Sequence, residues 1–168
     1  MTSVHTPPFK VLFLCTANSA RSILSEALLR HEGKERFQSF SAGSKPSSKV
    51  NPVAVQLLAM RGIPIDGLSS KSWHIFEGES APQMDFVFTV CGNARDEECP
   101  VWPGHPVTAH WGISDPAAVT GSDVERLAAF ESAYALLQKK IRMLIALPLE
   151  NMSDSERRAA CKDIGDIL

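Results

Sequence analysis

The chain has 168 residues, of which 44% are hydrophobic and 21% charged, and its formal net charge is −2. This size and composition suit a single domain over 1–168, with a core over about 9–147 and a C-terminal extension over 148–168. The small negative charge without a Lys/Arg cluster argues against nucleic-acid binding, and no apolar stretch reaches the length of a membrane span.

The spacing of apolar residues alternates between the periods of strands and helices. Three helix starts carry capping residues: Asn51 before Pro52, and Ser122 and Ser153, each with a glutamate three residues on. In chain order we expect a strand at 9–15, a helix at 22–32, a strand at 37–41, a helix at 51–61, a short helix around 72–76, a strand at 86–90, a polar loop at 91–106, a strand at 107–111, a long helix from 122 to 148, and a short terminal helix from 153 that holds Cys161.

This alternation predicts an α/β fold in three layers, with a four-stranded parallel sheet flanked by helices. In such folds the ligand binds beyond the carboxyl ends of the strands. Cys15, Cys91 and the loop that holds Asp115 each follow a predicted strand. We therefore expect them to collect at one end of the sheet.

The segment after the first strand has the residues of an oxyanion site. Its loop can point backbone N–H groups inward, and the following helix N-terminus adds partial positive charge. These groups and Arg21 should stabilise a Cys15 thiolate, while the arginine fork matches two oxygens of a tetrahedral anion and Ser22 can hydrogen-bond the sulfur. The alternative for Cys15 is a buried, inert thiol. We call the predicted anion-binding residues the oxyanion loop: Thr16, Ala17, Asn18, Ser19, Ala20 and Arg21.

Three further residues carry potential chemistry. Asp115, before Pro116, is either a turn residue or a general acid for a departing oxygen, and its expected place beside the oxyanion loop favours the acid. Cys91 and Cys99 flank a polar segment and are interpreted as a redox pair. The alternatives are a buried strand-end thiol and an incidental loop thiol, whereas their spacing fits no common zinc site.

These motifs together resemble a known family. The stretch from Cys15 to Ser22, the Ser-Ala-Gly at 41–43 and the Asp-Pro at 115–116 resemble the low-molecular-weight protein tyrosine phosphatase fold, over roughly 9–147. Within that fold, Cys91, Cys-Pro at 99–100 and His-Trp-Gly at 110–112 before Asp-Pro-Ala at 115–117 resemble its arsenate reductase branch.

The resemblance implies a three-thiol reaction. Cys15 attacks arsenate held by Arg21 and the oxyanion loop, while Asp115 helps hydroxide to leave. Cys91 then attacks the Cys15 sulfur and expels arsenite, and Cys99 attacks Cys91, which moves the disulfide to Cys91–Cys99. Thioredoxin would reduce that disulfide, although glutathione with glutaredoxin is an alternative donor.

Two other functions compete with this one. A phosphatase acting on phosphotyrosine or a small phosphoester would share the nucleophile and the acid, but Ala117 stands where such enzymes usually carry an aromatic residue. An oxyanion-binding sensor would not need Cys15, Arg21 and Asp115 all to be present.

The resemblance also bears on metals and location. Some reductases of this family bind potassium through an Asn, a Glu, a Ser and an Asp; Asn18, Glu26 and Ser41 match, but Trp73 takes the Asp position. We therefore expect no metal, and no other cofactor. Residues 1–8 look like a loose leader rather than an export signal, which predicts a reducing cytoplasm, with the four cysteines not in structural disulfides. Nothing in the sequence demands more than a monomer, which is the state we expect.

Overall fold

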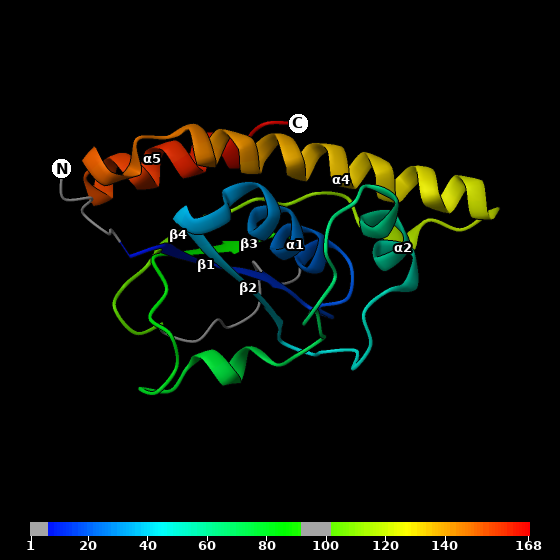
Figure 1. The fold of residues 1–168 in the computed structure, drawn as a ribbon, viewed down its shortest axis with the longest axis horizontal. Coiled ribbons are helices and arrows are strands. Elements are labelled where there is room, and N and C mark those ends of the chain that lie inside the picture. The colour runs from blue at the N-terminus through cyan, green and yellow to red at the C-terminus, as the bar shows by residue number, and fades with distance from the viewer. Residues whose placement is uncertain (1–6, 92–101) are drawn as a thin grey trace.

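Four parallel strands form the centre of the protein, in a computed structural model that describes residues 7–91 and 102–168 (Figure 1). The strand order is β2-β1-β3-β4, so the first strand lies inside the sheet. Residues 11–14 of that strand are fully buried, as expected for a central strand covered on both faces. The strands are β1 (Phe9–Cys15), β2 (Phe37–Gly43), β3 (Phe86–Thr89) and β4 (Val107–His110).

Helices follow the strands as predicted, and the three expected caps are confirmed. Asn51 accepts a hydrogen bond from the backbone N–H of Val53, and Ser122 and Ser153 accept from the N–H groups three residues on. The α-helices are α1 (Arg21–Gly33), α2 (Pro52–Met60), α4 (Asp123–Ala146) and α5 (Asp154–Gly165). The 3₁₀ helices are η1 (Lys34–Arg36), η2 (Trp73–Phe76), η3 (Pro116–Ala118) and η4 (Leu149–Asn151).

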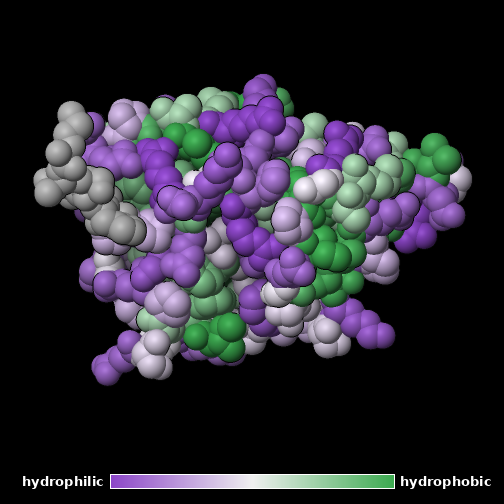
Figure 2. Space-filling view, in the orientation of Figure 1, coloured by the Kyte–Doolittle hydropathy of each residue, from purple (hydrophilic) through white to green (hydrophobic). Residues whose placement is uncertain are grey.

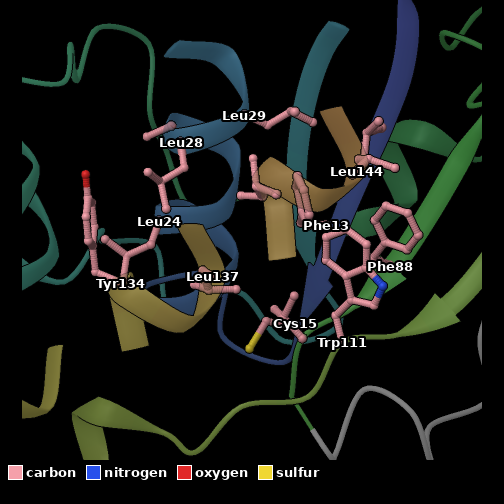
Figure 3. Close-up of a cluster of buried hydrophobic side chains, with 14 of the residues drawn as sticks. Phe13, Cys15, Leu24, Leu28, Leu29, Phe88, Trp111, Tyr134, Leu137 and Leu144 are labelled. Carbon is pink, nitrogen blue, oxygen red and sulfur yellow. The ribbon is translucent and has the colours of Figure 1, made fainter. Parts of the chain in front are cut away.

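Side chains from alternate positions of the strands form two hydrophobic clusters, one on each face of the sheet. The larger lies under α1, α2, α4 and α5, and includes the stacked rings of Phe88 and Trp111, with centroids 4.0 Å apart (Figure 3). The smaller lies under η2 and includes Trp73, Phe76 and Trp102. The predicted three-layer α/β fold is therefore confirmed, with its second outer layer made by η2 and irregular chain rather than by long helices.

The C-terminal helix α5 packs beside β4 and α4. Trp111 Nε1 donates a hydrogen bond to the carbonyl of Cys161 at 2.9 Å, and the Lys140 ammonium donates to the carbonyl of Gly165 at 2.7 Å. The Cys161 thiol is fully buried, and this burial raises its pKa to about 12. Cys161 is thus a packing residue.

The outer surface is mixed in character. Hydrophilic side chains cover much of the face in Figure 2, and hydrophobic ones gather in smaller groups between them. None of the helices in the described residues is both long enough and apolar enough to span a bilayer.

Candidate active site

The oxyanion loop connects the end of β1 to the start of α1, and its carbonyls face outward. The carbonyls of Cys15, Thr16, Ala17 and Ser19 accept hydrogen bonds of 2.9–3.3 Å from backbone N–H groups between residues 44 and 51. A trans peptide holds each carbonyl antiparallel to the next N–H. The N–H groups of residues 16, 17, 18 and 20 therefore point the other way, into the loop, as binding of a tetrahedral anion requires.

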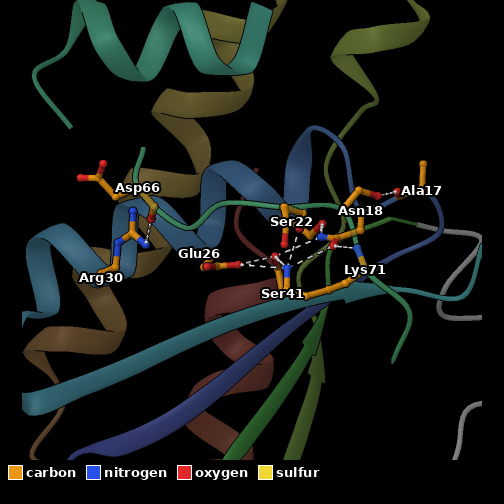
Figure 4. A network of polar contacts seen from close by, with 10 residues as sticks. Ala17, Asn18, Ser22, Glu26, Arg30, Ser41, Asp66 and Lys71 are labelled. Atoms are coloured by element: carbon orange, nitrogen blue, oxygen red, sulfur yellow. Dashed lines mark hydrogen bonds and ion pairs between the residues drawn. The ribbon is translucent and has the colours of Figure 1, made fainter. Parts of the chain in front are cut away.

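Asn18 holds the loop from behind. Its backbone lies in the left-handed region, with φ 49°, and its side chain is fully buried. The amide nitrogen donates to Ser22 Oγ at 2.8 Å and to Ser41 Oγ at 3.0 Å, while Oδ1 accepts from the backbone N–H of Lys71 at 2.9 Å (Figure 4). Asparagine tolerates this conformation better than most residues. Ser22 thus supports Asn18, and its bond to the Cys15 sulfur stays a prediction.

Gly43 sets the distance between β2 and the loop. We predicted that the second strand ends at Ser41, but it runs to Gly43, which pairs with Cys15. A Cβ atom on Gly43 would collide with the carbonyl oxygen of Thr16 and lie 3.0 Å from two atoms of Asn18. Only glycine permits this close approach.

Gly43→Ala should therefore destabilise the protein and distort the loop. We expect the free energy of unfolding to fall by about 1–3 kcal/mol, because overpacking against backbone has no easy relief. Urea unfolding measures this. The control is Gly78→Ala, whose added Cβ would have its nearest neighbour, Ser80 Oγ, at 3.9 Å. Equal stability of the two variants would contradict the assignment.

Cys15 and Cys91 lie against each other at the carboxyl ends of β1 and β3. Both side chains are buried, with exposures of 5% for Cys15 and 2% for Cys91. Their side chains share a hydrogen bond, and the Cys91 sulfur also lies 3.6 Å from Thr16 Oγ1. Cys15 itself is at the margin of the larger hydrophobic cluster (Figure 3). The structure therefore brings together two of the three predicted thiols; Cys99 lies outside the described residues.

The electrostatic setting of Cys15 differs from the expectation of an easily formed thiolate. Its pKa is raised, first because the protonated thiol hydrogen-bonds to Cys91, then because it is buried, and then by the charge of Cys91. Arg21 and the backbone N–H of Thr16 lower the pKa, as predicted, but less strongly. Cys91, which opposes these two groups, lies beside Cys15 only in the folded chain.

Arg21 and Asp115 face each other across the entrance to the loop. Arg21 Nη1 donates to the carbonyl of Ile113 at 3.0 Å, and its Nη2 lies 3.6 Å from Asp115 Oδ2. The other Asp115 oxygen accepts the N–H of Ala117 at 2.9 Å and starts η3. One carboxylate oxygen of Asp115 thus stabilises a turn, and the other lies near the Arg21 guanidinium. Its side chain is 41% exposed, whereas that of Arg21 is 14% exposed.

Sequence reasoning missed Lys71, which contacts the loop from the segment before η2. No spacing in the sequence points to it, because its partners Asn18 and Glu26 are distant in the chain. Trp73, the residue in the Asp position of the potassium-binding pattern, is buried and packs against Trp102 instead. Within 7–91 and 102–168, no group of three or more His, Cys, Asp or Glu residues could hold a metal ion.

Comparisons with known proteins match most of the chain. The family model described as low molecular weight phosphotyrosine protein phosphatase matches residues 10–156. An arsenate reductase of Shouchella clausii is 37% identical over 121 residues, which cover 72% of this chain and 84% of that protein. An arsenate reductase of Bacillus subtilis is 36% identical over 121 residues, which again cover 72% of this chain and 84% of that protein.

Solved structures show the same fold. An arsenate reductase in its oxidised state superposes with a TM-score of 0.66 at 26% identity, covering 82% of this chain and 96% of that one. A thioredoxin-dependent arsenate reductase of Corynebacterium glutamicum superposes with a TM-score of 0.55 at 26% identity. This match covers 84% of this chain but 65% of the other. The Escherichia coli tyrosine phosphatase Wzb shares the fold, with a TM-score of 0.64 at 21% identity. That match covers 81% of this chain and 95% of Wzb.

Proposed function

The chain belongs to the low molecular weight phosphotyrosine protein phosphatase family, and we propose that within it this protein is an arsenate reductase. The observation that carries the proposal is the contact between the side chains of Cys15 and Cys91 at the base of the oxyanion loop. Hydrolysis of a phosphoester needs one thiolate. Reduction of arsenate takes up two electrons, which two thiols supply by forming a disulfide. The arsenate reductases among the relatives support the same activity.

In the first step, the oxyanion loop and Arg21 hold arsenate by its oxygens. The Cys15 thiolate forms a sulfur–arsenic bond, and the bond from arsenic to one hydroxyl breaks. That hydroxide takes a proton from Asp115 and leaves as water. The 3.6 Å separation of Asp115 Oδ2 from Arg21 Nη2 supports this role, because Arg21 would hold the anion in the first step.

In the second step, the Cys91 sulfur attacks Cys15. A Cys15–Cys91 disulfide forms, the sulfur–arsenic bond breaks, and its electron pair stays on arsenic, which leaves as arsenite. Cys99 then attacks Cys91, releases the Cys15 thiolate and forms the Cys91–Cys99 disulfide. The contact between Cys15 and Cys91 means that the second step needs little chain movement.

A thiol donor must then reduce the Cys91–Cys99 disulfide. We place a thioredoxin-type protein in this role, since a thioredoxin-dependent reductase is among the structural neighbours. Glutathione with glutaredoxin is the alternative donor. The proposal includes a monomer working in the reducing cytoplasm, where such donors keep thiols reduced.

Phosphoester hydrolysis is the second candidate, because the matching family is one of phosphatases and the reaction would use the same Cys15, Arg21 and Asp115. Ala117 is exposed beside Asp115 and offers no aromatic ring for a phosphotyrosine to stack on. We therefore expect such hydrolysis as a residual activity.

The test is NADPH consumption by the purified protein with thioredoxin and thioredoxin reductase, with and without arsenate. Arsenate-dependent consumption that disappears in a Cys99→Ser variant is the expected result. NADPH consumption that occurs with glutathione and glutaredoxin but not with thioredoxin would identify glutathione as the electron donor, and the assignment as an arsenate reductase would stand. No consumption with either system, together with brisk phosphoester hydrolysis, would establish the phosphatase instead.

Asp115→Asn should slow arsenate reduction by about 10²–10⁴-fold, because the amide cannot donate the proton that the leaving hydroxide needs. The asparagine side chain can still accept the N–H of Ala117, so the turn should remain. Steady-state kinetics at several pH values measure the effect. Asp163→Asn, at an exposed position of α5, is the control. A rate equal to wild type would remove Asp115 from the chemistry.

A further inference from the structure

The Lys71 ammonium lies among four oxygen atoms behind the oxyanion loop (Figure 4). It donates to the carbonyl of Ser69 at 2.6 Å and lies 3.4 Å from both Asn18 Oδ1 and Ser41 Oγ. Glu26 Oε1 is 3.7 Å away. We call these four acceptors the oxygen cage. They come from the loop, α1, β2 and the segment before η2, so a single charge holds four parts of the chain together.

The oxygen cage needs a cation, since Glu26 is 7% exposed. Burial raises the pKa of its carboxyl, whereas the Ser41 hydroxyl and the Lys71 charge oppose that rise. Burial in turn lowers the pKa of Lys71, and Glu26 opposes the fall. A buried carboxylate that lost its partner would be left uncompensated, which is strongly unfavourable.

The same lysine controls the residue that shapes the loop. Its backbone N–H and its ammonium both point at Asn18 Oδ1, at 2.9 and 3.4 Å. The neighbouring Ser70 hydroxyl donates to the carbonyl of Ala17 at 2.9 Å. Because Asn18 has a left-handed backbone, its orientation depends on these partners. The peptide N–H groups on either side of Asn18 follow that orientation.

We propose that Lys71 is a positioning residue for oxyanion binding, and that its ammonium acts as a built-in monovalent cation. It fills the oxygen cage, fixes Asn18 and so holds the N–H groups of the oxyanion loop on the anion. Binding of the anion is therefore independent of dissolved potassium. The proposal rests on the proposed function only in taking arsenate as the natural anion.

Lys71→Met tests this, because it keeps most of the side-chain stem and removes the charge. The readout is the affinity for inorganic phosphate, measured as protection of Cys15 from iodoacetamide, in tetramethylammonium chloride and in potassium chloride of equal ionic strength. Wild type should bind phosphate equally in both salts. The variant should bind at least about tenfold more weakly without potassium, and potassium should restore most of the loss by entering the vacated oxygen cage.

Lys139→Met, at an exposed position of α4, is the matched control and should behave as wild type in both salts. Unchanged phosphate affinity in Lys71→Met would overturn the proposal. A loss that potassium does not restore would also overturn it, because a merely structural role predicts that outcome. Potassium dependence of the wild type would do the same.

A second variant covers the case in which Lys71→Met does not fold. Glu26→Gln combined with Lys71→Met leaves no buried charge unpaired. It should bind phosphate weakly and show no response to potassium. Affinity equal to wild type would overturn the proposal. Phosphate binding does not require turnover, so a protein that failed to reduce arsenate would still give a clear answer here.

Discussion

Replacing Cys15 with serine should abolish arsenate reduction and residual phosphoester hydrolysis together, lowering kcat/KM by at least about 10⁴-fold. A hydroxyl in this position is a far weaker nucleophile than a thiolate and cannot form a disulfide with Cys91. Oxyanion binding should survive, since it depends on backbone N–H groups and Arg21. Steady-state kinetics and calorimetric titration with phosphate measure the two properties separately.

The matched control is Cys161→Ala, which removes a thiol from the protein but not from the site. It should keep wild-type kcat/KM, although loss of a buried sulfur costs some stability. Turnover by Cys15→Ser would show that another group is the nucleophile. Loss of activity in both variants would point instead to a general requirement for intact packing.

Cys91→Ala should separate the two activities. Arsenate reduction should fall to background, because the thiol that attacks the Cys15 sulfur and releases arsenite has been removed. Phosphoester hydrolysis through Cys15 should continue, since hydrolysis needs only water to release the bound phosphate. Assays of both reactions on the same preparation provide the comparison.

The same variant should also lower the pKa of Cys15. The hydrogen bond that the protonated Cys15 thiol makes with Cys91 is the largest cause of the raised pKa, so removing Cys91 leaves Arg21 and the Thr16 N–H to act against burial alone. A lower pKa means that the thiolate persists to lower pH. The rate of Cys15 alkylation by iodoacetamide should therefore rise at a lower pH than in wild type. An unshifted pH profile would contradict the contact, and undiminished arsenate reduction would show that Cys91 is not the resolving thiol.

Much of the fold was accessible from local patterns. The continuous apolar run before Cys15 predicts a strand buried on both faces, and β1 is that strand. The capping residues before α2, α4 and α5 act locally, so they could be identified without the structure. The exact end of β2 could not, because pairing of Gly43 with Cys15 extends it.

The site was predictable to the extent that topology determined it. Parallel strands share their carboxyl edge, and this alone places Cys15, Cys91 and Asp115 near one another. The raised pKa of Cys15 depends on a contact between residues 76 positions apart, which residue type and spacing do not encode. Lys71 was missed for the same reason. The position of Cys99 stays a prediction.

A protein that passes a disulfide from one thiol to the next can lose it to any other reactive sulfur. Helix α5 removes that hazard for the fourth cysteine. Burial raises the pKa of Cys161 to about 12, so its thiol stays protonated at neutral pH, and its full burial keeps other sulfurs from reaching it. The C-terminal helix thus keeps this fourth thiol apart from the exchange that we propose among Cys15, Cys91 and Cys99.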